Sequence, residues 1–149
     1  MDHIYRQREL LQFIGIGKPG NVLEVHYTNL RFGNEGKPYH FAVNITYPGT
    51  SLETVFLVPV SSKLYQKRHF VELNLAKNSN LRETEGEELD QVSYALISRT
   101  RQLKIEKLFE PPASDVRGSL DSKKREEILN VRKIYLRAQF TKKQWGGSK

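Results

Sequence analysis

Short runs of apolar or alternating residues fill the middle of the chain, from about Val22 to Leu108. Gly, Asn, Pro and charged residues separate them, which is typical of short strands joined by turns. The runs are NVLEVHY (21–27), YHFAVNITY (39–47), ETVFLVPV (53–60), HFVELNL (69–75) and QVSYALIS (91–98). Because no helical segment comes between them, the pattern predicts a mainly β fold, a small antiparallel barrel or sandwich.

Helical spacing occurs at both ends of the chain. Residues 2–14 place several apolar side chains partly on one face, and GIGKPG (15–20) ends this predicted helix. Near the other end, LDSKKREEILNVRKIYLRAQF (120–140) is the strongest helix candidate, with Asp121 or Ser122 as its N-cap. The apolar face of this second helix is expected to consist of Ile128, Val131, Tyr135 and Ala138.

The length of 149 residues predicts a single domain, 1–149. We expect an N-terminal helix and turn (1–19), a β-barrel (20–110), a loop and C-terminal helix (111–140), and a frayed basic tail (141–149). No apolar run approaches the roughly 20 residues of a membrane span, and the N-terminus lacks the apolar centre of a signal peptide. The chain has no cysteine. These features predict a cytoplasmic protein without a membrane segment, disulfides or a thiolate metal site.

The net charge of +7 is unevenly distributed along the chain. Residues 1–116 hold 14 basic and 14 acidic residues, whereas residues 117–149 hold 10 basic and 3 acidic ones. A localised basic segment suits a phosphate backbone or an acidic partner, although a solvated helix face with a basic tail explains it equally well. The acidic run ETEGEELD (83–90) lacks the spacing of a calcium-binding loop and is predicted to be a solvated loop.

One predicted strand ends in an unusual way, because its apolar run stops at Ser61, Ser62 and Lys63. A rigid strand end that projects hydroxyl donors towards a cation can position and neutralise a phosphate. The alternative is that the two serines merely form a turn.

Several stretches, taken in order, resemble the PemK/MazF family of bacterial toxin endoribonucleases. They are GNVLEVHY (20–27), FGNEGKPYHFAVNI (32–45), VFLVPVSS (55–62), HFVELN (69–74), SYALISRTRQLKIEKL (93–108) and GSLDSKKREEI (118–128). The resemblance covers about residues 20–136. It implies an SH3-like antiparallel β-barrel followed by a C-terminal helix, to which the apolar spacing of residues 2–14 adds an N-terminal helix. It also implies metal-independent cleavage of single-stranded RNA by attack of the RNA's own 2′-hydroxyl, without a cofactor.

The resemblance also implies site residues. Ser61 takes the position of the family's catalytic threonine, and its neighbours Ser62 and Lys63 are predicted to bind substrate. The family's basic partner is an arginine before proline at the entry to the second strand. Counting without a gap places His40 there, whereas a short deletion places Lys37, which precedes Pro38.

We assign the acid–base role to His40 and a phosphate contact to Lys37, the alternative being that His40 is only a strand residue. Arg101 matches the arginine of the family's Arg-Thr-Ile-Asp, and Arg99 precedes it; both are predicted to bind substrate. Gln102 and Lys104 replace the threonine and aspartate of that motif.

The family resemblance implies a homodimer that binds single-stranded RNA across its groove, and an acidic antitoxin that covers the same groove. Two alternatives remain open. One is a catalytically silent SH3-like barrel that binds nucleic acid or protein. The other is a toxin on the same fold that poisons a protein target such as gyrase.

Overall fold

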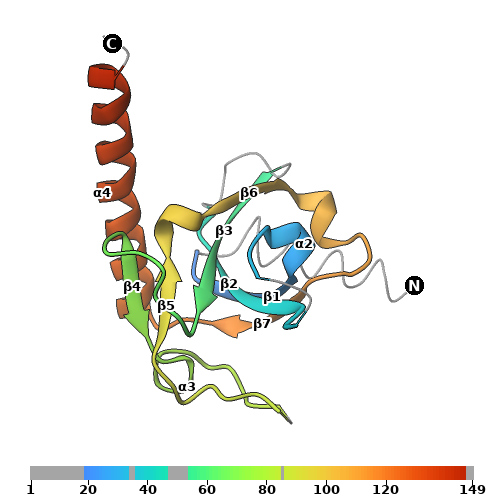
Figure 1. The fold of residues 1–149 in the computed structure, drawn as a ribbon. Helices are drawn as coiled ribbons and strands as arrows, with labels where there is room; N and C mark the ends of the chain where they lie inside the picture. The colour runs from blue at the N-terminus through green and yellow to red at the C-terminus, as the bar shows by residue number, and fades with distance from the viewer. Residues whose placement is uncertain (1–18, 34–35, 47–53, 85, 147–149) are drawn as a thin grey trace.

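The computed structural model describes residues 19–33, 36–46, 54–84 and 86–146. Each of the five predicted apolar runs forms a strand, so this prediction is confirmed (Figure 1). These strands are β1 (Asn21–His26), β2 (Tyr39–Asn44), β3 (Thr54–Ser61), β4 (Phe70–Leu73) and β5 (Ser93–Leu96). The helix predicted over residues 2–14 lies outside the described residues.

Two further strands and four short helices complete the central region. The strands are β6 (Arg101–Lys104) and β7 (Asp115–Ser119); the helices are α2 (Tyr27–Leu30), α3 (Leu75–Asn78), and the 3₁₀ turns η2 (Ile97–Arg99) and η3 (Ile105–Leu108). Strand β7 corrects the prediction that the β region ends at residue 110 and that a loop leads from there to the C-terminal helix, because β7 pairs with β1. The sequence of β7, DVRGS, lacks the apolar alternation that marks the other strands. Each of its residues is half-buried, so no face of the strand required apolar side chains. The sheet therefore extends beyond residue 110.

The sheet is antiparallel, with strand order β4-β5-β3-β2-β1-β7 and with β6 also paired to β3. Residues 54–57 of β3 pair with β6, whereas Val60 and Ser61 pair with β5. Pro59 lies between the β3 residues that pair with β6 and those that pair with β5. Proline has no N–H to donate to a ladder. In the described part of the chain, β4 and β7 are not paired with each other. The sheet is therefore not closed into a barrel, and the expected SH3-like barrel is not confirmed.

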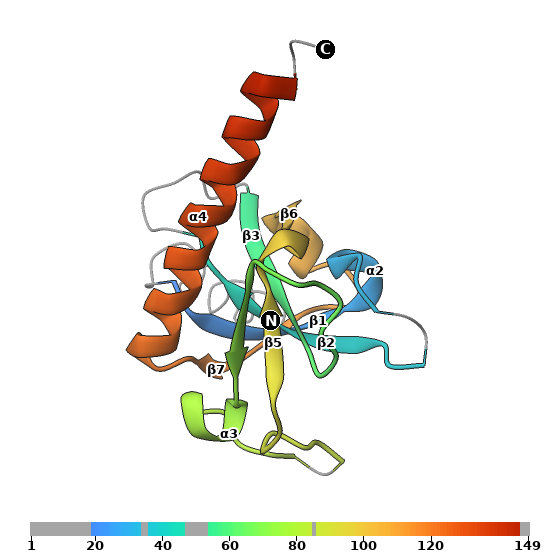
Figure 2. The ribbon, with the colours of Figure 1, turned by 60° about the vertical axis from the view of Figure 1, so that its left-hand side comes forward.

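Buried side chains form two clusters, and successive residues of β1 contribute to them in turn. Val22 belongs to one cluster and its neighbour Leu23 to the other, because successive strand residues point to opposite faces. The first cluster includes Ile128 and Leu129 of helix α4 (Ser122–Gly146). In Figure 2 this helix runs across the sheet region and continues beyond it.

Helix α4 begins where the sequence predicted, and Asp121 is its N-cap. The Asp121 carboxylate accepts a hydrogen bond from the backbone N–H of Lys124, with a distance of 2.8 Å. Val131 and Tyr135 pack against the core as expected, but Ala138 is exposed. The reason is that the outer part of the helix extends past the sheet, as both views show (Figures 1 and 2).

The same helix is longer than predicted. It continues to Gly146, so residues 141–146 are helical and the boundary at residue 140 was wrong. Its projecting part exposes Ile134, Leu136 and Phe140. Within the described residues, no helix combines the length and apolar character needed to cross a membrane.

Candidate active site

The end of β3 lies beside the start of β2. Ala42 pairs with Pro59 in antiparallel register, so the residues before Ala42 run alongside those after Pro59. This pairing brings the segment with Lys37 and His40 to the serines that end β3. The sequence predicted that a strand end with hydroxyls would meet a basic partner, and the sheet register provides that proximity.

A hollow of about 380 Å³ opens at this place; we call it the basic hollow. Six of the seven predicted site residues line it: Lys37, His40, Ser61, Ser62, Lys63 and Arg99. Phe32, Gly33 and Tyr65 complete its wall. Within the described residues, none of its three cations has an ion pair. Uncompensated positive charge beside hydroxyl groups is suited to an anionic ligand.

Ser61 takes part in a local turn. Its hydroxyl oxygen accepts a hydrogen bond from the backbone N–H of Lys63, with a distance of 3.1 Å, as in a serine turn. This bond uses a lone pair of the oxygen, so the hydroxyl hydrogen remains able to donate. The turn-forming role is therefore real, and it leaves the hydroxyl able to donate to a phosphate oxygen.

His40 is half-buried between Phe32 and Gly33. Its ring meets Phe32 edge-on, with the ring centroids 5.5 Å apart. Its Nε2 atom is buried and has no hydrogen-bond partner among the described residues. A Cβ atom on Gly33 would lie only 2.2 Å from this nitrogen, so only glycine fits there. In this structure Nε2 therefore faces the Gly33 backbone.

Burial lowers the pKa of His40 below its ordinary value, and the positive charge of Lys37 lowers it further. A hydrogen bond with the Lys37 backbone opposes these effects only in part. The lowered pKa favours the uncharged imidazole at neutral pH, which is the form that can accept a proton.

Arg101 does not line the basic hollow. It lies on β6, where its Nε atom donates to the backbone oxygen of Asn29 at 3.5 Å. Partial burial, and then the nearby charge of Arg31, lowers its pKa. The structure thus separates Arg101 from the six residues that it brings together.

A second hollow, of about 350 Å³, adjoins the same strand end; we call it the acidic hollow. Lys37, Ser61 and Ser62 line both hollows. The acidic hollow also contains Glu24, Tyr39, Phe41, Glu87, Glu88, Gln91 and Ser93. Alternation along β2 accounts for the division, because Tyr39 and Phe41 point to one side of the strand and His40 to the other.

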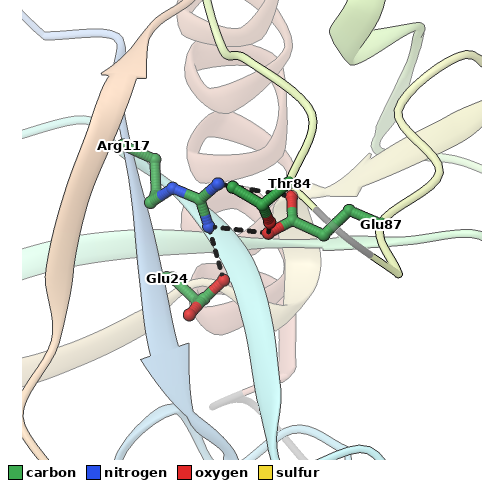
Figure 3. A network of polar contacts seen from close by, with 4 residues as sticks. All are labelled: Glu24, Thr84, Glu87 and Arg117. Carbon is green, nitrogen blue, oxygen red and sulfur yellow. Dashed lines mark hydrogen bonds and ion pairs between the residues drawn. The ribbon is translucent and has the colours of Figure 1, made fainter.

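Arg117 of β7 binds Glu24 and Glu87, two of the carboxylates that line the acidic hollow (Figure 3). Its Nη1 atom donates to Glu24 at 2.8 Å and to Glu87 at 3.0 Å, and its Nη2 atom donates to Glu87 at 3.3 Å. Thr84 also donates to Glu87. The predicted solvated loop over residues 83–90 is thus anchored by Glu87, and by Leu89, which is buried. The loop is therefore less solvated than predicted, because Glu87 contacts Arg117, which is 30 positions away in the sequence.

The two glutamates have opposite pKa shifts. Burial raises the pKa of Glu24, and Arg117 offsets this only in part. Burial also acts to raise the pKa of Glu87, but hydrogen bonds from Thr84 and Arg117 outweigh it, and the pKa is lowered. Arg117 makes two N–H contacts with Glu87 and one with Glu24, so Glu87 is its main partner.

Sequence reasoning missed the Arg117 network and the glycine under His40. Arg117 and Glu24 are 93 positions apart, and no local pattern connects them. Gly33 offered a weak signal, since it precedes the basic segment in the FGNEGKP stretch (32–38).

No family model matches the chain, and no curated protein matches it significantly. The PemK/MazF resemblance therefore depends on the sequence motifs alone. Within the part of the chain that the structure describes, no group of three or more His, Cys, Asp or Glu side chains could hold a metal ion.

Proposed function

We propose that this protein is a toxin-type endoribonuclease that cleaves single-stranded RNA. The observation that supports the proposal is the basic hollow. It brings together two serine hydroxyls, three cations and an uncharged histidine from separate segments of the chain. These are the groups that phosphate transfer to a 2′-hydroxyl requires.

The proposed reaction begins with attack of a 2′-oxygen on the adjacent phosphorus. His40 accepts the proton from the 2′-hydroxyl as the new O–P bond forms. Lys37, Lys63 and the Ser61 hydroxyl stabilise the negative charge on the phosphorane oxygens. The bond to the 5′-oxygen then breaks, and this oxygen takes a proton from water and leaves as a hydroxyl, while protonated His40 returns its proton to water. The products are a 2′,3′-cyclic phosphate and a 5′-hydroxyl end.

The position of His40 Nε2 favours a second candidate, a binding module without catalysis. This atom is buried against Gly33, so it can take a proton only if RNA binding moves the ring or the glycine. Hydrogen bonds in a catalytic site often tighten only with substrate bound, so this geometry does not remove His40 as the base. The silent module would keep the phosphate contacts and lack the proton transfer.

The resemblance extends the proposal to fold and partners. We propose that the open sheet is a variant of the SH3-like barrel. An isolated bridge between Ser79 and Leu120 supports this, since it joins the segments that follow β4 and β7. A homodimer, an acidic antitoxin and a cytoplasmic location are also part of the proposal.

The test is incubation of the purified protein with a long single-stranded RNA in EDTA, followed by analysis of the RNA ends. We expect 2′,3′-cyclic phosphate ends, and at least about 10²-fold slower cleavage by Ser61→Ala, the usual scale for loss of a positioned catalytic group. Ser122→Ala, an exposed serine at the start of α4, is the matched control and should cleave normally. Cleavage by Ser61→Ala at the wild-type rate would remove Ser61 from the site. RNA binding without any cleavage would establish the binding module instead.

A further inference from the structure

The end of β3 forms a ridge between two hollows of opposite charge. Lys37, Ser61 and Ser62 line both hollows. On one side the described side chains add two further cations, Lys63 and Arg99. On the other side they add three carboxylates. An RNA strand whose phosphate rests on the ridge therefore extends over both hollows.

The acidic hollow is unsuited to a phosphate, because its carboxylates repel one. Its other walls suit a nucleobase. Tyr39, which is exposed, offers aromatic surface for stacking, and Gln91 and Ser93 offer polar groups for a base edge. Single-stranded RNA is read by stacking of unpaired bases on aromatic side chains and by hydrogen bonds to their edges.

We propose that the acidic hollow binds the base of a nucleotide flanking the phosphate at Ser61, and that this base is guanine. The inference rests on the proposed function, since it takes the ridge as the phosphate site. It adds a specificity pocket to that site.

Guanine is favoured by the direction of its hydrogen bonds. A carboxylate only accepts hydrogen bonds, and guanine presents two adjacent donors, N1–H and N2–H, on one edge. One carboxylate can accept both in parallel. Adenine and cytosine place a ring nitrogen acceptor beside their amino group, and uracil has a single N–H between two carbonyls. Each of these would direct a lone pair at the carboxylate.

Glu88 is the carboxylate best placed for this role. Glu24 and Glu87 are already bound by Arg117, whose guanidinium also stacks over Phe41 at 5.6 Å from the ring centroid. This network attaches the loop that contains Glu88 to the sheet (Figure 3). Glu88 is exposed, and among the described residues its side chain has no ion pair.

The test measures binding by the wild-type protein to short 2′-fluoro RNAs, which lack the attacking hydroxyl and cannot be cut. Each is an oligouridine with one central G, A, C or U. We expect the RNA with central G to bind about tenfold or more tightly than the others, as one bidentate base contact provides. Glu88→Gln should abolish this preference, because an amide offers one acceptor and one donor. Glu106→Gln, the same change at an exposed position outside both hollows, should keep it.

The outcomes separate this inference from the proposed function. Equal affinity for all four RNAs would overturn the guanine pocket and leave the RNA-binding proposal intact. A preference for another base would overturn the guanine assignment. If Glu88→Gln strengthens binding of all four RNAs equally, the carboxylate only repels the backbone, and the pocket is wrong. Failure of wild-type protein to bind any of these RNAs or an unmodified RNA would overturn the proposed function together with the pocket.

Discussion

His40 is the residue whose environment bears most directly on the proposed chemistry. Its ring is half-buried, its pKa is lowered by burial and by Lys37, and its Nε2 faces Gly33. The lowered pKa favours the uncharged imidazole, and the buried Nε2 makes its role as a base depend on a movement of the ring or of Gly33. Two predictions follow from that position.

The first concerns the pH dependence of cleavage. If uncharged His40 is the base, kcat/KM should rise with pH through a value below the ordinary histidine pKa of about 6.5 and should be level above pH 7. Lys37→Met should move this rise to higher pH, because it removes the positive charge that lowers the His40 pKa. His40→Ala should lose the rise together with most of the activity. A flat profile, with Lys37→Met more damaging than His40→Ala, would make Lys37 the family's basic residue.

The second concerns the contact between Gly33 and His40. Gly33→Ala combines an unfavourable positive φ of 98° with a clash against the imidazole. Gly86→Ala is the matched control, because its φ is 86° and a Cβ there would meet nothing within 4 Å. We expect Gly33→Ala to lower the free energy of unfolding by about 1–3 kcal/mol more than the control, the usual cost of overpacking. Chemical denaturation would measure both.

The double variant Gly33→Ala/His40→Ala provides the check on that prediction. Removing the imidazole should relieve the clash, so the extra loss should largely disappear. If the double variant is as unstable as the sum of both single variants, the two residues do not interact as the structure indicates.

Among the elements, α4 depends on a defined start. Asp121 caps its first turn through the Lys124 N–H and also contacts Asn78, whose Nδ2 donates at 3.4 Å. Asp121→Ala should therefore lower the free energy of unfolding by about 1 kcal/mol, the typical cost of losing an N-cap. Ser122→Ala should change it by much less. Equal losses in thermal unfolding would show that Asp121 is not the cap.

For the whole molecule, the uneven charge makes the basic C-terminal segment a second candidate for contact with RNA. A chain that ends after Phe140 lacks Lys142, Lys143 and Lys149. If all three contact phosphates, the slope of log affinity against log salt should shrink by roughly 2, at about 0.7 per contact for single strands. A full-length variant with glutamine at the three positions controls for the loss of chain length. An unchanged slope in both would place the phosphate contacts in the basic hollow alone.

The sequence by itself predicted the five central strands, the start of α4 and six residues of the basic hollow. Short apolar runs and an N-cap are local features, readable within a few residues. The order of the motifs then suggested which hydroxyls and cations belong together. That grouping came from the family resemblance, in which a hydroxyl at the end of the third strand works with a basic residue at the entry to the second.

Tertiary structure alone decided the remaining features. Strand β7 exists because β1 offers it hydrogen-bonding partners, and its own half-exposed residues do not indicate a strand. Arg117 meets Glu24 and Glu87 across 93 and 30 positions, and His40 needs Gly33 because its imidazole lies where a Cβ atom of any other residue would be. These contacts depend on how distant segments are brought together in space. For the same reason, only the folded chain could show that the strand end with Ser61 separates a basic hollow from an acidic one.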